Sequence, residues 1–299
     1  MLGRVDLGEL MARHGGISSR AALIRASSRA EVDRALAAGV LVRAGHGRYV
    51  LPEVDAAART AHAMNGVLCL TSAALHHGWE VKTAPDKPHV LVPRKRNVPD
   101  HLRRAVVLHR RDLGPDDVSA GATSRELTLE QCLRLLPYDE ALVIADSALR
   151  NGEHATLARA AALVRGRGEQ QAARVAREAR PESANAFESA TRAICHRVPG
   201  LHVEPQVVVS DPFVWARPDL VDRDLELAIE CESYEWHGDR AGFRKDVRRY
   251  TLLAASGWMV LRFTWEDVMF RPDWVEAVLT RAVAVRARTL VRHDLRVAA

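Results

Sequence analysis

One segment of this 299-residue chain alternates strictly between apolar and polar side chains. From Leu225 to Glu232, apolar side chains occupy every second position and the positions between them carry three glutamates and an alanine, which predicts a β-strand. The preceding Asp222-Arg223-Asp224 is typical of a turn, and an earlier short apolar run ends at Arg217-Pro218-Asp219. The pattern therefore predicts a β-hairpin that brings Asp219 towards Glu230 and Glu232.

Three carboxylates on one rim of a sheet repel one another unless a cation lies between them. Mg²⁺ takes oxygen ligands, usually from one or two carboxylates. The hairpin therefore predicts a site for a divalent metal, with Mg²⁺ or Mn²⁺ as the expected cofactor.

The same stretch resembles the PD-(D/E)XK nuclease superfamily and, within it, small domains related to the very-short-patch-repair endonuclease. The motifs that carry the resemblance are Pro218-Asp219, Glu230-Cys231-Glu232-Ser233 and Trp236-His237, and the resemblance extends over residues 184–299. In this chain Glu232 stands at the superfamily's lysine position, and Glu232-Ser233 replaces an Asp-Gly pair that is common in these relatives.

The resemblance implies a set of roles at the hairpin. It makes Asp219 and Glu230 the metal-holding carboxylates, with the carbonyl of Cys231 as a third ligand. Glu232 is then a further ligand or orients the attacking water. His237 is the candidate general acid or base, because its ordinary pKa near 6.5 suits that task. A loop histidine bonded to backbone is the alternative for His237.

A helix predicted over residues 184–198 carries Glu188. Folds of the superfamily often place an acid on this helix, so the resemblance makes Glu188 a metal-associated catalytic candidate; the alternative is a solvated glutamate. A strand is predicted over residues 202–209. A helix predicted over residues 241–255 is accompanied by two basic rows that are candidate phosphate contacts or a solvated face. One row is Arg240, Arg244 and Arg248, and the other is Lys245 and Arg249.

The net charge of +5 is modest, but the excess is rich in arginine, which suits bidentate contacts to phosphate. No apolar run approaches the roughly 18 residues that span a membrane, and the first residues do not have a signal-peptide pattern. The four cysteines are scattered, which indicates neither a zinc site nor a disulfide framework. We therefore expect a cytoplasmic, mixed α/β protein without a membrane partner.

The first 52 residues predict a winged helix-turn-helix, in which the third helix enters the DNA major groove. Serines at 18–19 and 27–28 are candidate helix caps. Residues 1–50 carry eight Arg against four Asp and Glu. The alternative is a module that binds protein alone. The elements expected are helices over 5–13, 20–26 and 29–38 and a hairpin over 41–51, and the expected DNA contacts are Arg29, Arg34, Arg43 and Arg48.

This segment resembles the N-terminal domain of AbiE-type (type IV) antitoxins. The matching stretches are His14-Gly15-Gly16-Ile17, residues 37–41, and Gly47-Arg48-Tyr49-Val50-Leu51-Pro52. Residues 53–165 follow the order of the antitoxins' middle region and predict a mixed α/β domain. Residues 166–183 are the predicted linker into the last domain. The resemblance implies a transcriptional repressor with a cognate nucleotidyltransferase toxin as a possible partner.

Two functions follow from these patterns. The first is a DNA-binding protein whose last domain is a metal-dependent endonuclease. The second is an AbiE-type antitoxin and repressor in which the nuclease-like domain is inactive. In both cases DNA is the expected partner.

Overall fold

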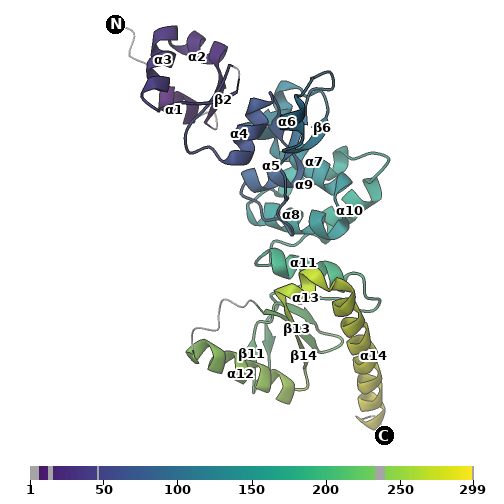
Figure 1. The fold of residues 1–299 in the computed structure, drawn as a ribbon. Helices are drawn as coiled ribbons and strands as arrows, with labels where there is room; N and C mark the ends of the chain where they lie inside the picture. The colour runs from purple at the N-terminus through teal and green to yellow at the C-terminus, as the bar shows by residue number, and fades with distance from the viewer. Residues whose placement is uncertain (1–6, 13–15, 46, 233–239, 298–299) are drawn as a thin grey trace.

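The structure is a computed structural model and describes residues 7–12, 16–45, 47–232 and 240–297. The fold is mixed α/β, as predicted. Figure 1 shows an elongated molecule in which an N-terminal body, a middle body and a C-terminal body follow one another along the chain. Among the described residues no helix has the length and apolar character needed to cross a membrane.

The N-terminal body contains the three short helices and the hairpin that the sequence predicts. Ser19 caps one helix by accepting from Ala22 N at 3.2 Å, and Ser28 caps the next by accepting from Glu31 N at 3.2 Å. A short strand that was not predicted, β1, pairs with the hairpin to give a sheet of order β1-β3-β2. The elements are α1 (Leu7–Ala12), β1 (Ile17–Ser19), α2 (Arg20–Ala26), α3 (Arg29–Ala37), β2 (Val42–Gly45) and β3 (Arg48–Val50).

The middle body packs helices against a five-stranded mixed sheet of order β6-β5-β4-β8-β7. Its strands are β4 (Val67–Leu68), β5 (His89–Val92), β6 (Val107–Arg110), β7 (Val118–Ser119) and β8 (Ala122–Thr123). Its helices are α4 (Ala56–Ala63), α5 (Leu70–His76), α6 (Asp100–Arg103), α7 (Arg125–Leu135), α8 (Tyr138–Arg150), α9 (His154–Leu163) and α10 (Glu169–Glu178).

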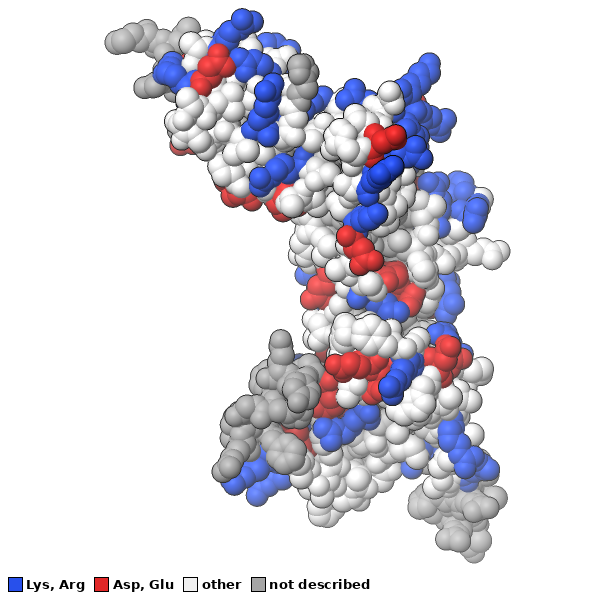
Figure 2. Space-filling view, in the orientation of Figure 1, with Lys and Arg blue, Asp and Glu red and all other residues white. Residues whose placement is uncertain are grey.

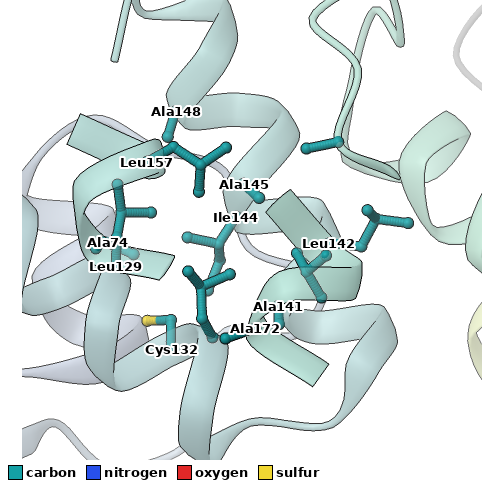
Figure 3. Packing of buried hydrophobic residues seen from close by; sticks show 14 of the residues in the cluster. Ala74, Leu129, Cys132, Ala141, Leu142, Ile144, Ala145, Ala148, Leu157 and Ala172 are labelled. Atoms are coloured by element: carbon teal, nitrogen blue, oxygen red, sulfur yellow. The ribbon is translucent and has the colours of Figure 1, made fainter. Parts of the chain in front are cut away.

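The helix α10 corrects the prediction of a linker over residues 166–183. Ala172, Val175 and Ala179 form a buried stripe on this mostly polar helix and belong to the core of the middle body. Figure 3 shows Ala172 among core side chains of the neighbouring helices, including Cys132 and Ala141. The polar composition concealed this narrow apolar stripe, and the segment is part of the middle body.

The C-terminal body is built on a four-stranded sheet of order β14-β13-β12-β9, in which β12 and β13 are antiparallel and β13 and β14 are parallel. One face of this sheet packs against α11, α13 and α14, and the other face packs against α12. The elements are α11 (Ala186–Cys195), β9 (Glu204–Pro205), β10 (Val209–Ser210), β11 (Trp215–Ala216), β12 (Leu220–Asp222), β13 (Leu227–Glu232), α12 (Arg240–Ala255), β14 (Met259–Thr264), α13 (Trp265–Phe270) and α14 (Pro272–Val297).

The predicted hairpin is confirmed, with Leu220 of β12 opposite Ile229 of β13. The prediction of one strand over residues 202–209 is wrong. Gln206 has a positive φ of 57°, which an extended strand does not accommodate, so the chain forms two short strands that join different sheets. Residues 227–230 are buried on both sides of β13 instead of presenting one face to water, because α12 covers the second face.

A buried ion pair joins the middle and C-terminal bodies. Arg192 of α11 lies 2.6 Å from Asp146 of α8, and the two side chains are 2% and 0% exposed. The second oxygen of Asp146 accepts from the backbone N of Arg180 at 2.7 Å, and Arg192 also donates to the carbonyl of Glu178 at 2.7 Å. The ion pair therefore fixes α11, which carries Glu188, against the middle body.

Candidate active site

The predicted acidic residues meet at one edge of the C-terminal sheet. Asp219 directly precedes β12, and the antiparallel register places it beside the end of β13 that carries Glu230 and Glu232. One oxygen of Asp219, Oδ2, accepts from the backbone N of Cys231 at 2.8 Å. Figure 2 shows Asp and Glu side chains gathered around the waist between the middle and C-terminal bodies. The predicted approach of Asp219 to this strand is thus confirmed.

Gln206 links two of the carboxylates, and sequence reasoning did not assign it to the site. Its Nε2 donates to Oε2 of Glu188 at 3.0 Å and to Oδ1 of Asp219 at 3.2 Å. The positive φ of this residue turns the chain between β9 and β10. The sequence signal was a single amide within the apolar run Pro205–Val209, at a position where members of the resembled superfamily carry a polar residue.

Glu188 is buried, with 4% of its surface exposed, so the alternative of a solvated glutamate is wrong. Its carboxylate accepts from the backbone N of Ala184 at 2.8 Å and from Asn185 Nδ2 at 3.1 Å. Burial raises its pKa, and the neighbouring charge of Asp219 raises it further. The resemblance-based assignment of Glu188 to the site therefore agrees with its position.

Glu230 is also buried, with 3% of its surface exposed. Its Oε1 lies 3.1 Å from the guanidinium of Arg249 but has no hydrogen-bond partner. Burial, aided by the charges of Asp219 and Glu232, raises the pKa of Glu230 to about 8, and the attraction of Arg249 offsets only part of that rise. Burial also raises the pKa of Asp219. The negative charge of both carboxyls is thus only partly compensated.

Glu232 has a different environment. Its Oε1 accepts from the Tyr250 hydroxyl at 2.5 Å and from Arg262 Nε at 2.8 Å. Partial burial raises the pKa of Glu232, but the hydrogen bonds from Arg262 and Tyr250 outweigh that effect and lower it. The structure therefore places this carboxylate as a partner of protein cations, with its Oε1 already occupied by two donors.

The structure describes Cys231 of the predicted motif but not His237. Cys231 lies beside Asp219 through its backbone N, while its thiol contacts Thr191 Oγ1 of α11 at 3.3 Å. Burial raises the pKa of this thiol well above its ordinary value, so it is protonated. His237 and the adjacent Trp236 lie outside the described residues.

The site offers a divalent cation two carboxylates. Among the described residues, no group of three or more His, Cys, Asp and Glu side chains has the arrangement of a metal site. Mg²⁺, however, is commonly held by one or two carboxylates and several waters. The buried Oε1 of Glu230, which accepts no hydrogen bond, and the nearby Asp219 provide that donor set. Asp219 and Glu230 are therefore the residues that would hold the ion.

The predicted DNA contacts of the N-terminal body fall into two groups. Arg29, Arg34 and Arg43 are exposed. The guanidinium of Arg34 forms a long ion pair with the carboxylate of Glu31, with 3.9 Å between the nitrogen and the oxygen. Arg48 instead donates to the side chain of Asn65 in the middle body and is half-buried, which lowers its pKa. Arg48 is therefore a contact between the two bodies. Figure 2 shows Lys and Arg side chains spread over the visible face of the N-terminal and middle bodies.

The predicted basic rows of α12 are divided between solvent and the site. Arg244, Lys245 and Arg248 are exposed, and no carboxylate of the described chain forms an ion pair with them. Arg249, predicted as part of the second basic row, and Tyr250, predicted to pack inward, face β13 and contact Glu230 and Glu232. The spacing of Asp246, Arg249 and Tyr250 on one helical face was the signal for this arrangement.

The raised pKa of Glu230 predicts a pH dependence of stability in metal-free protein. A carboxyl that titrates near 4.5 when unfolded and near 8 when folded favours folding in its protonated form, so its favourable contribution is lost as the pH rises through that window. We expect the free energy of unfolding of wild type, minus that of Glu230→Gln, to fall between pH 5 and 8 when measured by urea denaturation in EDTA. A difference in the free energy of unfolding that does not change with pH would contradict this account.

No family model matches the chain. Two relatives from Mycobacterium tuberculosis, the uncharacterized proteins Rv2248 of strain H37Rv and MT2308 of strain CDC 1551, are each 30% identical to it over 270 residues, which cover 85% of this chain and 96% of theirs. The crystal structure of the RV2827C protein from the same species is 16% identical, covers 69% of this chain and 87% of its own, and has a TM-score of 0.32.

Proposed function

We propose that this chain, which belongs to the family of the mycobacterial proteins Rv2248 and MT2308, binds DNA and hydrolyses its phosphodiester bonds with the help of a divalent metal ion. One observation carries the proposal. Glu188, Asp219 and Glu230 come from three separate elements and meet at one sheet edge, where burial raises the pKa of each. Clustered carboxylates whose pKa values are raised by burial are typical of functional sites.

The order of elements also supports the proposal. The helix α11 is followed by β9, β12 and β13, and α12 leads to the parallel strand β14. This is the order of helix, hairpin strands, helix and strand that the resemblance to PD-(D/E)XK nucleases implies. Asp219 and Glu230 stand at the sheet edge where that resemblance places the metal-holding acids.

Each residue of the site has a task in the proposed reaction. Asp219 and Glu230 would hold Mg²⁺ or Mn²⁺, and the ion would supply positive charge against the scissile phosphate. Gln206 donates to Asp219 and Glu188 and so fixes the orientation of both carboxylates. Because Glu232 cannot provide the positive charge of a lysine, Arg249 is the cation of this chain that lies beside Glu230. A guanidinium there suits contact with phosphate oxygens.

The proposed DNA contacts lie on two parts of the molecule. Arg29 and Arg34 on α3 with Arg43 on β2 form one exposed set, and Arg244, Lys245 and Arg248 on α12 form the other. In this proposal the first set recognises duplex DNA and the second holds the backbone next to the acidic site. The protein then acts in the cytoplasm.

One observation favours a second function. Glu232 is occupied by Arg262 and Tyr250, and Glu230 is paired with Arg249, so protein cations already compensate part of the acidic charge. That arrangement suits a nuclease-like domain that has become structural. In this alternative the chain is an AbiE-type repressor with a nucleotidyltransferase toxin as its partner.

Titration calorimetry with Mn²⁺ tests the proposed site. Wild type should show a binding event that Asp219→Asn combined with Glu230→Gln removes, and Glu266→Gln, an exposed acid on α13, should leave it unchanged. Because the pKa of Glu230 is about 8, binding at pH 7 should release a proton, and the observed heat should differ between buffers of different ionisation enthalpy. Equal binding by wild type and the double variant would exclude this site.

A further inference from the structure

The hairpin formed by β10 and β11, just ahead of the acidic site, presents two aromatic side chains to solvent. Phe213 and Trp215 are 79% and 74% exposed, the largest values among the large apolar side chains that the structure describes. Large exposed apolar groups are costly in a free protein unless they have a binding role. Their position four to six residues before Asp219 places them close to the proposed chemistry.

The hairpin packs against α12 through its buried side chains. Exposed and buried side chains alternate from Phe213 to Arg217. Val214 and Ala216 point inward and pack with Leu253 of α12, while Phe213, Trp215 and Arg217 alternate with them and are exposed. At the tip, Asp211 Oδ1 accepts from the backbone N of Phe213 at 2.7 Å and from that of Val214 at 2.9 Å. The ordered turn and the packed inner face direct both rings outward.

The charge around this face identifies the kind of partner. Arg217 continues the exposed stripe, and within the described parts of the chain no carboxylate pairs with it. The neighbouring α12 adds Arg244, Lys245 and Arg248, which are equally without carboxylate partners there. Aromatic rings that are interleaved with unneutralised arginine suit the bases and phosphates of a nucleic-acid strand.

We infer that Phe213, Trp215 and Arg217 form a stacking face for unpaired nucleobases of a DNA strand that enters the acidic site. Phe213 lies in the bend at the tip and Trp215 opens β11, so the two exposed rings are two residues apart and each can stack on a base. Trp215 is four residues from Asp219, so the two backbones are at most roughly 14 Å apart, a distance that about four stacked nucleotides cover.

This inference rests on the proposed function and specifies its substrate class. Bases inside a duplex are already stacked on one another and cannot stack on protein rings without being unpaired. The preferred substrate is therefore DNA with a single-stranded or distorted segment next to the bond that is cut.

Oligonucleotide binding without metal tests the stacking face. The full chain in EDTA is titrated against fluorescein-labelled oligo(dT) and a duplex of equal length, and anisotropy is measured at two salt concentrations. Phe213→Ser combined with Trp215→Ser is compared with Phe270→Ser combined with Trp274→Ser, a control pair that is 70% and 51% exposed on α13 and α14. Circular dichroism and thermal melting verify that both variants are folded.

We expect the hairpin variant to bind the single strand at least tenfold more weakly, because each stacked base contributes substantially to such complexes. The control should stay within about twofold, and the salt dependence of binding should be unchanged because the phosphate contacts remain. The loss should be larger for the single strand than for the duplex.

Three results would overturn the inference: unchanged affinity of the hairpin variant, an equal loss in the control, or a wild-type dimer that the hairpin substitutions dissociate without affecting oligonucleotide affinity. The last result would assign the face to contact between copies of the chain. Because the assay contains no metal, its outcome is independent of cleavage. A chain that binds single strands through this face but never cuts DNA would contradict the proposed hydrolysis alone.

Discussion

Replacing Asp146 by alanine is expected to lower the free energy of unfolding by about 3–5 kcal/mol, because it leaves the charge of Arg192 buried without a partner. Both side chains are almost inaccessible to water and their charged atoms are 2.6 Å apart. The substitution also removes the acceptor for the backbone N of Arg180. Urea denaturation of the full chain, followed by circular dichroism, measures the effect.

A matched exposed pair provides the control. Asp273 is 92% exposed and lies 3.0 Å from Arg197, so Asp273→Ala should change the free energy of unfolding by at most about 1 kcal/mol. Replacing both buried partners, as in Asp146→Leu with Arg192→Met, should recover much of the lost stability, since no unpaired charge remains. If Asp146→Ala cost no more than the control, the ion pair would not be the joint between α8 and α11.

Asp219→Asn is expected to reduce DNA cleavage by about a thousandfold, because the metal ion's stabilisation of transition-state charge amounts to several kcal/mol. Affinity for DNA should change by less than about twofold, since this carboxylate is not among the proposed DNA contacts. The fold should tolerate the change, because burial raises the pKa of Asp219 and disfavours its charged form. Single-turnover cleavage and anisotropy titrations on the same preparation measure both quantities.

The complementary variant separates recognition from chemistry. Arg29→Ala combined with Arg34→Ala should weaken DNA binding by tenfold or more if either residue contacts a base, while cleavage at saturating DNA stays at the wild-type rate. Loss of cleavage without loss of binding in this variant would contradict the division of tasks.

The parts of the fold that local rules determine could be predicted from the sequence. The alternation after Leu225 and the turn at Asp222-Arg223-Asp224 predict the β12–β13 hairpin, and Ser19 and Ser28 mark helix starts, because these signals act between neighbouring residues. The approach of Asp219 to Glu230 follows directly from that hairpin.

The remaining features depend on packing between distant segments. Glu230 is buried because α12 covers the second face of β13, and Arg249 reaches it only because that helix packs in one orientation. The role of Gln206 depends on a single positive φ, which no residue pattern specified. The polar composition around α10 predicts a linker, because the buried stripe that makes this helix part of the core is only three residues.

Incubation of supercoiled plasmid DNA with the full chain tests the central claim most directly. In Mg²⁺ or Mn²⁺ wild type should convert the plasmid to nicked and linear forms, and the reaction should stop in EDTA and in the Asp219→Asn variant. The contradicting result is a plasmid that stays supercoiled with wild type in both metals. If that same protein binds the DNA upstream of its own coding sequence, the repressor function replaces the nuclease function.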